Sequence, residues 1–377
     1  MKTMKVLLFP ALLMLCCNSA DKESAVAAND LPLSSIKLPP GFSISIYAEV
    51  ESARSLALSP SGTLFVGNRD ENTVYAVKDT DGDNVADKKW VVASGLHSPN
   101  GVAFQNGDLY IAEISRISKI TGIESKLSNP GKPETVYDKY PTDEHHGWKY
   151  IAFGPDGKLY VPVGAPCNIC ESSNPVYASI TRMNPDGTGM EVFVSGVRNS
   201  VGFTWHPVTK NIWFTDNGRD MLGDDMPPCE LNTAASAGMH FGYPYCHGGT
   251  IKDPEFGSKR PCSDFIQPAQ NLGAHVAPLG LKFYTGSQFP ENYRNNIIVA
   301  EHGSWNRSKK SGYKLSLVKV DANSKVTGYE TFASGWMNES TQKVWGRPVD
   351  MVVMPDGAML VSDDYAGVIY RIAYKAP

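Results

Sequence analysis

The densest run of charged and polar side chains lies in residues 196–232. Arg198 and Asn199 open this run, two short apolar segments joined by a turn follow, and Asp216 begins an acidic loop rich in glycine and proline. Two paired strands would hold the guanidinium and the loop in place, and binding residues tend to lie on loops held by such a scaffold. A guanidinium binds anions, whereas carbonyls and carboxylates bind hard cations. The run is therefore a candidate binding site, with an acidic surface turn as the alternative.

A second oxygen-rich run offers ligands at alternate positions, namely Asp79, Asp81, Asp83, Val85 (through its carbonyl) and Asp87. This spacing follows the calcium-binding loop of the EF-hand. The twelfth position holds Trp90 instead of Glu, and no helical pattern flanks the run. We therefore expect either a structural calcium site or a plain aspartate-rich hairpin loop.

The elements that must position these residues repeat along the chain. Each repeat is an apolar strand, a turn of the Pro-Asp-Gly kind and a second apolar strand, and copies begin near residues 55, 101, 150, 200, 278 and 347. A further strand follows each copy, and the spacing is typical of propeller blades. A strand-like segment at residues 41–50 would join the last blade. We predict an all-β, six-bladed β-propeller in residues 37–377, with its ring closed by this N-terminal strand.

Two stretches depart from the repeat. Residues 242–273 form an insertion that we place between the fourth and fifth blades, with Cys246 and Cys262 as a disulfide pair inside it. Residues 232–238 are the one segment with a helix-like pattern. Both stretches lie outside the strands that define the blades.

The first residues are typical of an export signal. Two lysines precede an apolar run at residues 6–15, which is too short to span a bilayer. The cysteine pair that follows is similar to a bacterial lipoprotein processing site, in which Cys17 would carry the lipid and tether the protein to the membrane; ordinary secretion is the alternative. We therefore predict a signal at residues 1–17, a flexible tether at residues 18–36 and a periplasmic or membrane-anchored location.

The cysteines and the net charge indicate which disulfides, cofactors and partners the protein could have. In an exported protein, Cys167 and Cys170 could form a small disulfide loop, and Cys229 is left as a free buried thiol. Haem is not indicated because Glu171 rather than His follows the pair, and no second ligand pair has suitable spacing for zinc. A formal net charge of −4 gives no basic footprint and argues against nucleic acid as a partner.

In a propeller, the loops at one end of the blades converge, so residues that are far apart in the sequence meet. Chemistry-bearing residues occupy these loops: Glu113, Arg116, His145, His146, Arg198, Asn199, residues 216–225, residues 302–307 and Arg347. Convergent polar groups in a concave place are the usual mark of a binding site. We therefore expect one shared site.

Four distinctive strings occur in order: GVRN…NGRDMLGDDMPPCELN, HVAPLGLKFYTGSQFP, AEHGSWNRSKKSGYK and GRPVDMVVMPDG. Together they resemble the glucose/sorbosone dehydrogenase family, and most of all its sorbosone-dehydrogenase-like branch, over about residues 37–374. The resemblance implies a six-bladed propeller that binds pyrroloquinoline quinone (PQQ) with calcium. It also implies oxidation of sugars or aldoses outside the cytoplasm.

The resemblance assigns roles to individual residues. His146 matches the general base, which takes the hydroxyl proton while hydride passes to the quinone. His145 stands where soluble glucose dehydrogenase has an Asp, and it would support the base. Arg198 matches the arginine beside the reactive quinone carbonyl, where a fixed positive charge stabilises the developing oxyanion. Asn199 would contact the same oxygen.

Further cations are required because PQQ carries three carboxylates. Arg347 matches a cofactor-binding arginine, but the slot of a second family arginine is Val349 here. The other implied cofactor contacts are Lys310 or Arg307 as the replacement cation, Trp305 as a stacking partner, and His302 and His275 on the same face. The backbone carbonyls of Gly218 and Arg219 match the calcium ligands of the family, while Cys229 takes a place often held by Asp.

The sequence thus predicts a PQQ- and calcium-dependent dehydrogenase for a sugar, aldose or sugar-derived aldehyde. Electrons would pass to an external acceptor, a cytochrome or a quinone, because the chain carries no haem motif. One alternative is a propeller hydrolase of the lactonase type, in which calcium activates water. Another is a non-catalytic propeller that serves as a binding module.

Overall fold

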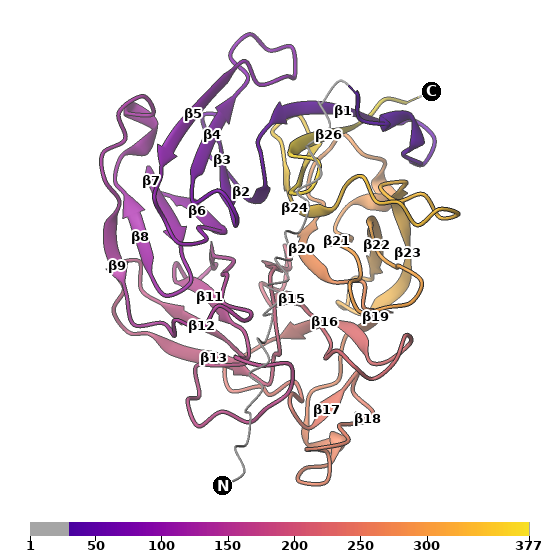
Figure 1. The fold of residues 1–377 in the computed structure, drawn as a ribbon. Coiled ribbons are helices and arrows are strands. Elements are labelled where there is room, and N and C mark those ends of the chain that lie inside the picture. Colours follow the sequence, from indigo (N-terminus) through magenta and orange to yellow (C-terminus); the bar gives the residue numbers. More distant parts are fainter. Residues whose placement is uncertain (1–29, 377) are drawn as a thin grey trace, which may run out of the picture.

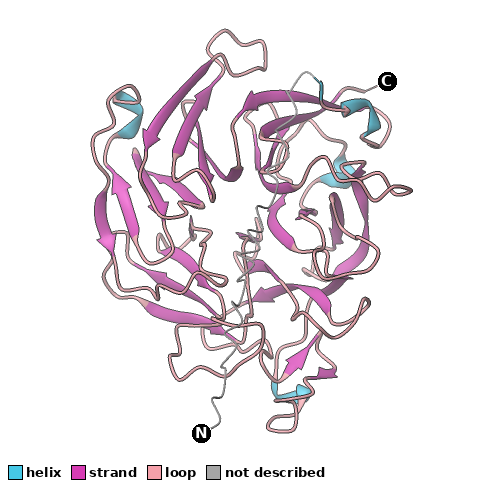
Figure 2. Cartoon of the chain, in the orientation of Figure 1, coloured by secondary structure: helices cyan, strands magenta, loops and turns pink. Residues whose placement is uncertain are grey.

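The structure is a computed structural model that describes residues 30–376. The predicted signal at residues 1–17, Cys17 and most of the predicted tether lie outside the described residues. Six four-stranded antiparallel sheets stand around a common centre as the blades of a propeller do (Figure 1). The described part is all-β apart from short 3-10 turns (Figure 2). The predicted six-bladed β-propeller is therefore confirmed.

The first three blades follow the chain in order. Blade one consists of β2 (Ala53–Leu58), β3 (Leu64–Asn68), β4 (Val74–Lys78) and β5 (Lys88–Ala93). Blade two consists of β6 (Gly101–Gln105), β7 (Asp108–Ala112), β8 (Ile117–Ile120) and β9 (Glu134–Tyr137). Blade three consists of β10 (Ala152–Phe153), β11 (Leu159–Val163), β12 (Ser179–Met183) and β13 (Glu191–Ser195).

The last three blades include one interruption and one strand from the N-terminal side. Blade four consists of β14 (Phe203–Trp205), β15 (Ile212–Asp216), β16 (Pro228–Ala234) and β19 (Gln270–Ala274). Blade five consists of β20 (Pro278–Phe283), β21 (Ile297–Glu301), β22 (Lys314–Val320) and β23 (Val326–Ser334). Blade six consists of β24 (Pro348–Val353), β25 (Met359–Asp363), β26 (Val368–Tyr374) and β1 (Phe42–Glu49).

The N-terminal strand β1 closes the ring as predicted. It pairs antiparallel with β26, with Phe42 opposite Tyr374 and Glu49 opposite Val368. Figure 1 shows the indigo β1 beside the yellow β26. A sheet built from both ends of the propeller leaves no gap in the ring, because the last blade cannot be completed without the first described strand.

The insertion lies inside blade four and not between blades four and five. β17 (Cys246–His247), β18 (Ile251–Lys252) and the 3-10 turn η4 (Cys262–Asp264) come after β16 and before β19, which pair in one sheet. The sequence prediction was wrong because β19, of sequence QNLGA, lacks the apolar alternation of a strand. The helix-like residues 232–238 were also misread, since β16 extends to Ala234. The disulfide between Cys246 and Cys262 is confirmed.

The described end of the predicted tether is fixed against the ring. Leu31 is buried, and Leu33 and Ile36 pack on the apolar cluster shared by blades five and six. Residues 33–35 form the 3-10 turn η2 (Leu33–Ser35). For this part the prediction of a flexible tether is wrong, because its apolar side chains cover the core. None of the helices in residues 30–376 is long and apolar enough to cross a membrane.

Strand direction decides where each connection emerges. The first strands of neighbouring blades contact one another and so line the centre. Because the strands of a blade are antiparallel, the start of the first strand, the end of the second and the start of the third all lie at the same end of the propeller. The link from the third strand to the fourth lies at the other end. Loops far apart in the sequence are thereby brought together.

Candidate active site

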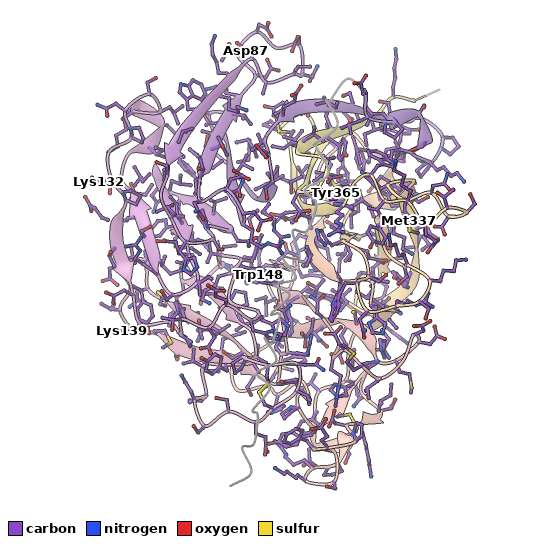
Figure 3. All side chains as sticks on the ribbon, in the orientation of Figure 1. Asp87, Lys132, Lys139, Trp148, Met337 and Tyr365 are labelled. Carbon is purple, nitrogen blue, oxygen red and sulfur yellow. A yellow bond between two sulfur atoms is a disulfide. The ribbon has the colours of Figure 1, made fainter. Side chains whose placement is uncertain are left out.

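A cavity of about 390 Å³ lies where the first strands begin and the second strands end. The predicted residues in its wall are His145, His146, Arg198, Asn199, Gly218, His275, His302, Trp305 and Arg347. Figure 3 shows Trp148, another residue of the wall, near the middle of the ring. The structure thus brings His146, Arg198 and Arg347 to one cavity, as a shared site requires.

His146 lies just before blade three and is held in one tautomer. Its Nδ1 lies 2.9 Å from the carbonyl oxygen of Ala165, which can only accept, so Nδ1 carries the proton and Nε2 keeps its lone pair. Burial, followed by the charge of Arg198, lowers the pKa of His146 to about 2. A Cβ on Gly164 would lie 2.5 Å from the His146 Cβ, so only glycine permits this approach. The neutral ring is in the state that a general base requires.

The guanidinium of Arg198 is buried, and all five of its N–H groups have acceptors. Nε donates to the backbone carbonyl of Asn168 at 2.8 Å, and one Nη2 proton goes to the side-chain oxygen of the same residue at 2.9 Å. Nη1 donates to the carbonyls of Asn217 and Gly218 at 3.1 and 3.0 Å. Nη2 also pairs with Asp220 at 3.1 Å. Arg198 therefore presents a fixed positive charge and no spare donor.

A buried pair of carboxyl groups, those of Asp216 and Glu230, supports the backbone at Arg198. Asp216 accepts the backbone N–H groups of Arg198 at 2.9 Å and of Asn199 at 2.7 Å, and so fixes the lead-in to β14. Burial and the charge of Asp216 raise the pKa of Glu230 to about 8. The side-chain oxygen of Asn232 has no partner among the described residues, and turning this amide would let a protonated Glu230 donate to it. The pair holds one proton at neutral pH.

Two donors of the wall are buried without a partner. The Nε of Arg347 and the indole N–H of Trp148 find no hydrogen-bond acceptor within residues 30–376. The Arg347 guanidinium lies 5.1 Å from the ring centroid of Tyr365. A buried donor without an acceptor costs free energy. The two N–H groups therefore indicate that the cavity takes a ligand with acceptor oxygens.

Arg54 and Arg69 line the cavity, and neither was predicted from the sequence. Arg54 donates to Asp364 at 2.6 Å, and the other oxygen of this carboxylate lies 2.8 Å from Nε2 of His302. His302 and Arg54 hold the pKa of Asp364 far below its usual range despite burial. Arg69 lies 5.1 Å over the ring of Trp148. Arg54 interrupts an apolar inner strand, a signal that could have revealed it, whereas no pattern marks Arg69.

Arg307 and Lys310 do not reach the cavity, so the prediction that either replaces the missing family arginine is wrong. Arg307 pairs with Asp225 at 2.7 Å, and Lys310 donates to the backbone carbonyl of Gln342 at 3.0 Å. Both follow residues 302–305 in the connection from β21 to β22, and only residues 302–305 of this connection line the cavity. Arg54 and Arg69 of blade one line the cavity instead, and Arg54 is paired there with Asp364.

Three further predictions concern the margins of the cavity. Trp305 is 73% exposed, so it lies at the rim and could cover one side of a flat ligand. Val349, in the slot of the second family arginine, is buried against Val201 and Leu279, and these two residues give the cavity an apolar floor. Cys229 is a buried free thiol as predicted, and burial raises its pKa to about 11.

The two predicted metal regions differ in geometry. Gly218 lines the cavity and its carbonyl accepts from Arg198, whereas Arg219 is not among the lining residues and its side chain pairs with Asp253 at 2.5 Å. In the aspartate-rich run, Asp79, Asp81 and Asp87 each place one ligand oxygen within 4.8 Å of the others. Asp83 stays outside this group, and its carboxylate accepts the backbone N–H of Val85 at 2.8 Å. Figure 3 shows Asp87 at the outer edge, far from the central cavity.

The wall fits a flat polyanion such as PQQ. Four arginines line it (Arg54, Arg69, Arg198 and Arg347), against one carboxylate, Asp220. Unpaired N–H groups, aromatic rings and an apolar floor complete the wall. Charge-assisted hydrogen bonds from arginine are the strongest contacts that a protein offers to carboxylates. The residues present therefore suit the cofactor that the sequence resemblance implies.

Known structures share this fold. The chain superposes on the Trichoderma reesei Carbohydrate-Active Enzymes Family AA12 protein with a TM-score of 0.78 and 20% identity, covering 90% of this chain and 98% of that one. The PQQ domain of pyranose dehydrogenase from Coprinopsis cinerea gives 0.75 and 19%, covering 90% and 97%. The PQQ-bound aldose sugar dehydrogenase from Streptomyces coelicolor gives 0.64 and 21%, covering 90% and 100%. At such identities the likeness concerns the fold.

Sequence relatives extend the comparison. An uncharacterized protein of Borreliella burgdorferi is 33% identical over 93% of both chains. A PQQ-dependent pyranose dehydrogenase of Coprinopsis cinerea is 32% identical over 28% of this chain and 16% of its own length. The TrAA12-like family model matches residues 36–375. The chain therefore belongs to the TrAA12-like family, in agreement with its resemblance to the glucose/sorbosone dehydrogenases.

Proposed function

We propose that this protein is a PQQ-dependent dehydrogenase that oxidises a sugar, an aldose or a sugar-derived aldehyde. The observation that carries the proposal is the cavity wall, in which four arginines surround a neutral histidine of fixed tautomer. Membership of the TrAA12-like family and the likeness in fold to PQQ-bound sugar dehydrogenases support it. When bound, the quinone would supply the two-electron acceptor that the side chains lack.

His146 takes the hydroxyl proton of the substrate through Nε2. The Ala165 carbonyl keeps the ring in this tautomer, and the depressed pKa keeps Nε2 free of a proton at neutral pH. A bound polyanion would raise the pKa of His146 by favouring the protonated ring, which makes it a better base where the chemistry occurs. His145 lies beside it, with ring centroids 4.0 Å apart, and shapes the pocket.

The arginines bind and orient. Arg347 and Trp148 offer their unpaired N–H groups to carboxylate oxygens, and Arg69 adds a charge over the same indole. Arg198 holds its charge in place through its hydrogen bonds, so the charge is already in position when negative charge develops in the reaction. Trp305 at the rim would limit the access of water to the cavity.

We also propose calcium beside the Gly218 carbonyl and Asp220, because both offer hard oxygens to the cavity. The Arg198 guanidinium already donates to that carbonyl at 3.0 Å, so cation binding requires Arg198 to release it. A cation here would thus leave one Nη1 proton of Arg198 available to another acceptor. Export, a lipid on Cys17 and an external electron acceptor remain part of the same proposal.

The residues of the cavity wall favour the two alternative functions, a hydrolase and a binding module, less than they favour a dehydrogenase. A lactonase-type hydrolase needs several carboxylates around its calcium, whereas Asp220 is the one carboxylate among the lining residues of the described chain. A pure binding module would not require a buried histidine with its basic nitrogen kept free. The oxidoreductase proposal accounts for both features.

Reconstitution tests the proposal. Apoprotein is titrated with PQQ in calcium and in EDTA, followed by the absorbance of the cofactor, and then assayed for dye reduction across a panel of aldoses. We expect saturable binding and sugar-dependent reduction. Absence of PQQ binding would favour a binding module, and lactone hydrolysis without PQQ would favour the hydrolase.

A further inference from the structure

The connection from β11 to β12, residues 164–178, carries the disulfide between Cys167 and Cys170. The disulfide is confirmed, yet nothing in the proposed chemistry uses it. The two residues that it encloses are Asn168 and Ile169. A covalent closure around two residues on the cavity face suggests that one of them must be held in place.

Asn168 makes four hydrogen bonds to two residues of the cavity wall. Its backbone oxygen accepts Arg198 Nε at 2.8 Å, and its side-chain oxygen accepts Arg198 Nη2 at 2.9 Å. The same side-chain oxygen accepts the backbone N–H of Asp220 at 2.8 Å, and its Nδ2 donates to the Asp220 carbonyl at 3.1 Å. One side chain thus joins the cavity cation to the loop that follows β15.

The disulfide loop is itself anchored on both sides. The backbone N–H of Cys170 donates to the hydroxyl oxygen of Tyr243 at 3.0 Å, and the backbone N–H of Ala165 donates to the carbonyl of Arg198 at 2.8 Å. The carbonyl of Ala165 fixes His146 at 2.9 Å. A single connection of blade three therefore contacts both residues to which the proposed function gives chemical roles.

We propose that Asn168 is a positioning residue: clamped in the Cys167–Cys170 loop, it sets the Arg198 guanidinium and the Asp220 loop for the anionic cofactor. This inference rests on the proposed function. A long arginine side chain loses rotamer freedom when it is held, and preformed contacts supply that order before the ligand arrives. Asn168 donates nothing to the reacting atoms, and it acts through Arg198 and Asp220.

Asn168→Ala removes the side-chain contacts and keeps the disulfide. We expect faster hydrogen exchange, measured by mass spectrometry, in the peptide that contains the Asp220 amide, and PQQ binding weakened by about 10- to 100-fold, the usual effect of removing such a supporting partner. With PQQ saturating, kcat should fall while KM for sugar changes less than two-fold. Asn168→Asp keeps the side-chain oxygen that accepts from Arg198 and from the Asp220 N–H but loses the Nδ2 donor, so it should restore slow exchange in part.

The paired variant Cys167→Ser/Cys170→Ser keeps Asn168 but opens the loop, and it should fall between the wild type and Asn168→Ala. Asn174→Ala is the matched control, because this exposed asparagine belongs to the same connection and bonds locally to the backbone N–H of Val176.

Unchanged exchange and unchanged PQQ affinity in Asn168→Ala would overturn the inference, as would an equal effect in the control. If the wild type binds no PQQ, the proposed function fails, while the exchange measurement still decides whether Asn168 orders Arg198 and Asp220. If Asn168→Ala does not fold, the serine pair and Asn168→Asp decide through the same two measurements.

Discussion

Two oxygen-rich loops of this protein look alike in sequence and differ in place. The loop after β15, which begins at Asp216, follows the second strand of blade four and reaches the cavity. The aspartate-rich run at residues 79–87 joins the third and fourth strands of blade one, so it emerges at the opposite end of the propeller. The two loops emerge at opposite ends because one follows a second strand and the other follows a third strand, and antiparallel strands alternate in direction.

Burial gives the carboxylates of the two regions opposite character. Near the cavity, burial raises the pKa of Asp216 to about 7 and that of Glu230 to about 8. In the outer run, hydrogen bonds from neighbouring N–H and hydroxyl groups lower the pKa values of the partly exposed Asp79 and the exposed Asp87. Burial thus favours a proton on the first region, whereas hydrogen bonds favour the charged form of Asp79 and Asp87 in the second.

The largest expected effect tests whether chemistry belongs to the cavity alone. His146→Ala should keep PQQ binding but lower turnover by about 10²- to 10⁴-fold, because the base is removed. Asp81→Asn in the outer run should leave turnover unchanged. Dye-coupled rates of the reconstituted proteins measure both, and near-normal turnover of His146→Ala would remove this residue from the role of base.

The next prediction compares two positively charged residues at the end of the propeller that holds the cavity, one inside the cavity and one outside it. Arg347→Ala should weaken PQQ binding by about 10- to 100-fold, since a charged hydrogen bond contributes roughly 1.5–3 kcal/mol. Lys310→Ala, which removes a cation at the same end but outside the cavity, should change affinity by less than about two-fold. Absorbance titration compares the two, and equal losses would show that general charge, not placement, binds the cofactor.

The pH dependence of stability separates buried from exposed carboxyl groups. The raised pKa of Glu230 means that the folded state holds a proton that the unfolded state releases, so the free energy of unfolding should fall as pH rises from about 5 to about 8. The slope is about 1.4 kcal/mol per pH unit for one proton. Urea unfolding of Glu230→Gln should show a flatter slope in this window, and an unchanged slope would assign the proton elsewhere.

The smallest effect concerns calcium at the outer run. If Asp79, Asp81 and Asp87 hold the ion with the weak affinity of extracellular modules, about 10 mM calcium would stabilise the fold by roughly 1–3 kcal/mol. The melting temperature of the apoprotein should therefore rise with calcium. Asp79→Asn should reduce this rise without altering PQQ affinity, and a rise equal to that of the wild type would exclude the site.

The fold was largely predictable from the sequence. Six copies of a strand–turn–strand pattern determine six blades, and the strand at residues 41–50 has only the incomplete last blade to join. The fourth strand of blade four was not predictable, because its polar sequence QNLGA becomes a strand only through pairing with β16. The described end of the tether was not predicted for a similar reason. Its three apolar side chains pack against the core, and no local pattern shows that contact.

By itself, the sequence determined the blade count and the residue types that suit a polyanion, because these follow from local periodicity and chemical type. It suggested the two disulfide pairs, which the structure confirms. Only the tertiary structure decided which positively charged side chains line the cavity. Arg54 and Arg69 join the cavity and Lys310 does not, because the path of each connection over the rim depends on packing. The same packing made Asn168 a neighbour of Arg198, a contact between residues 30 positions apart that no local pattern encodes.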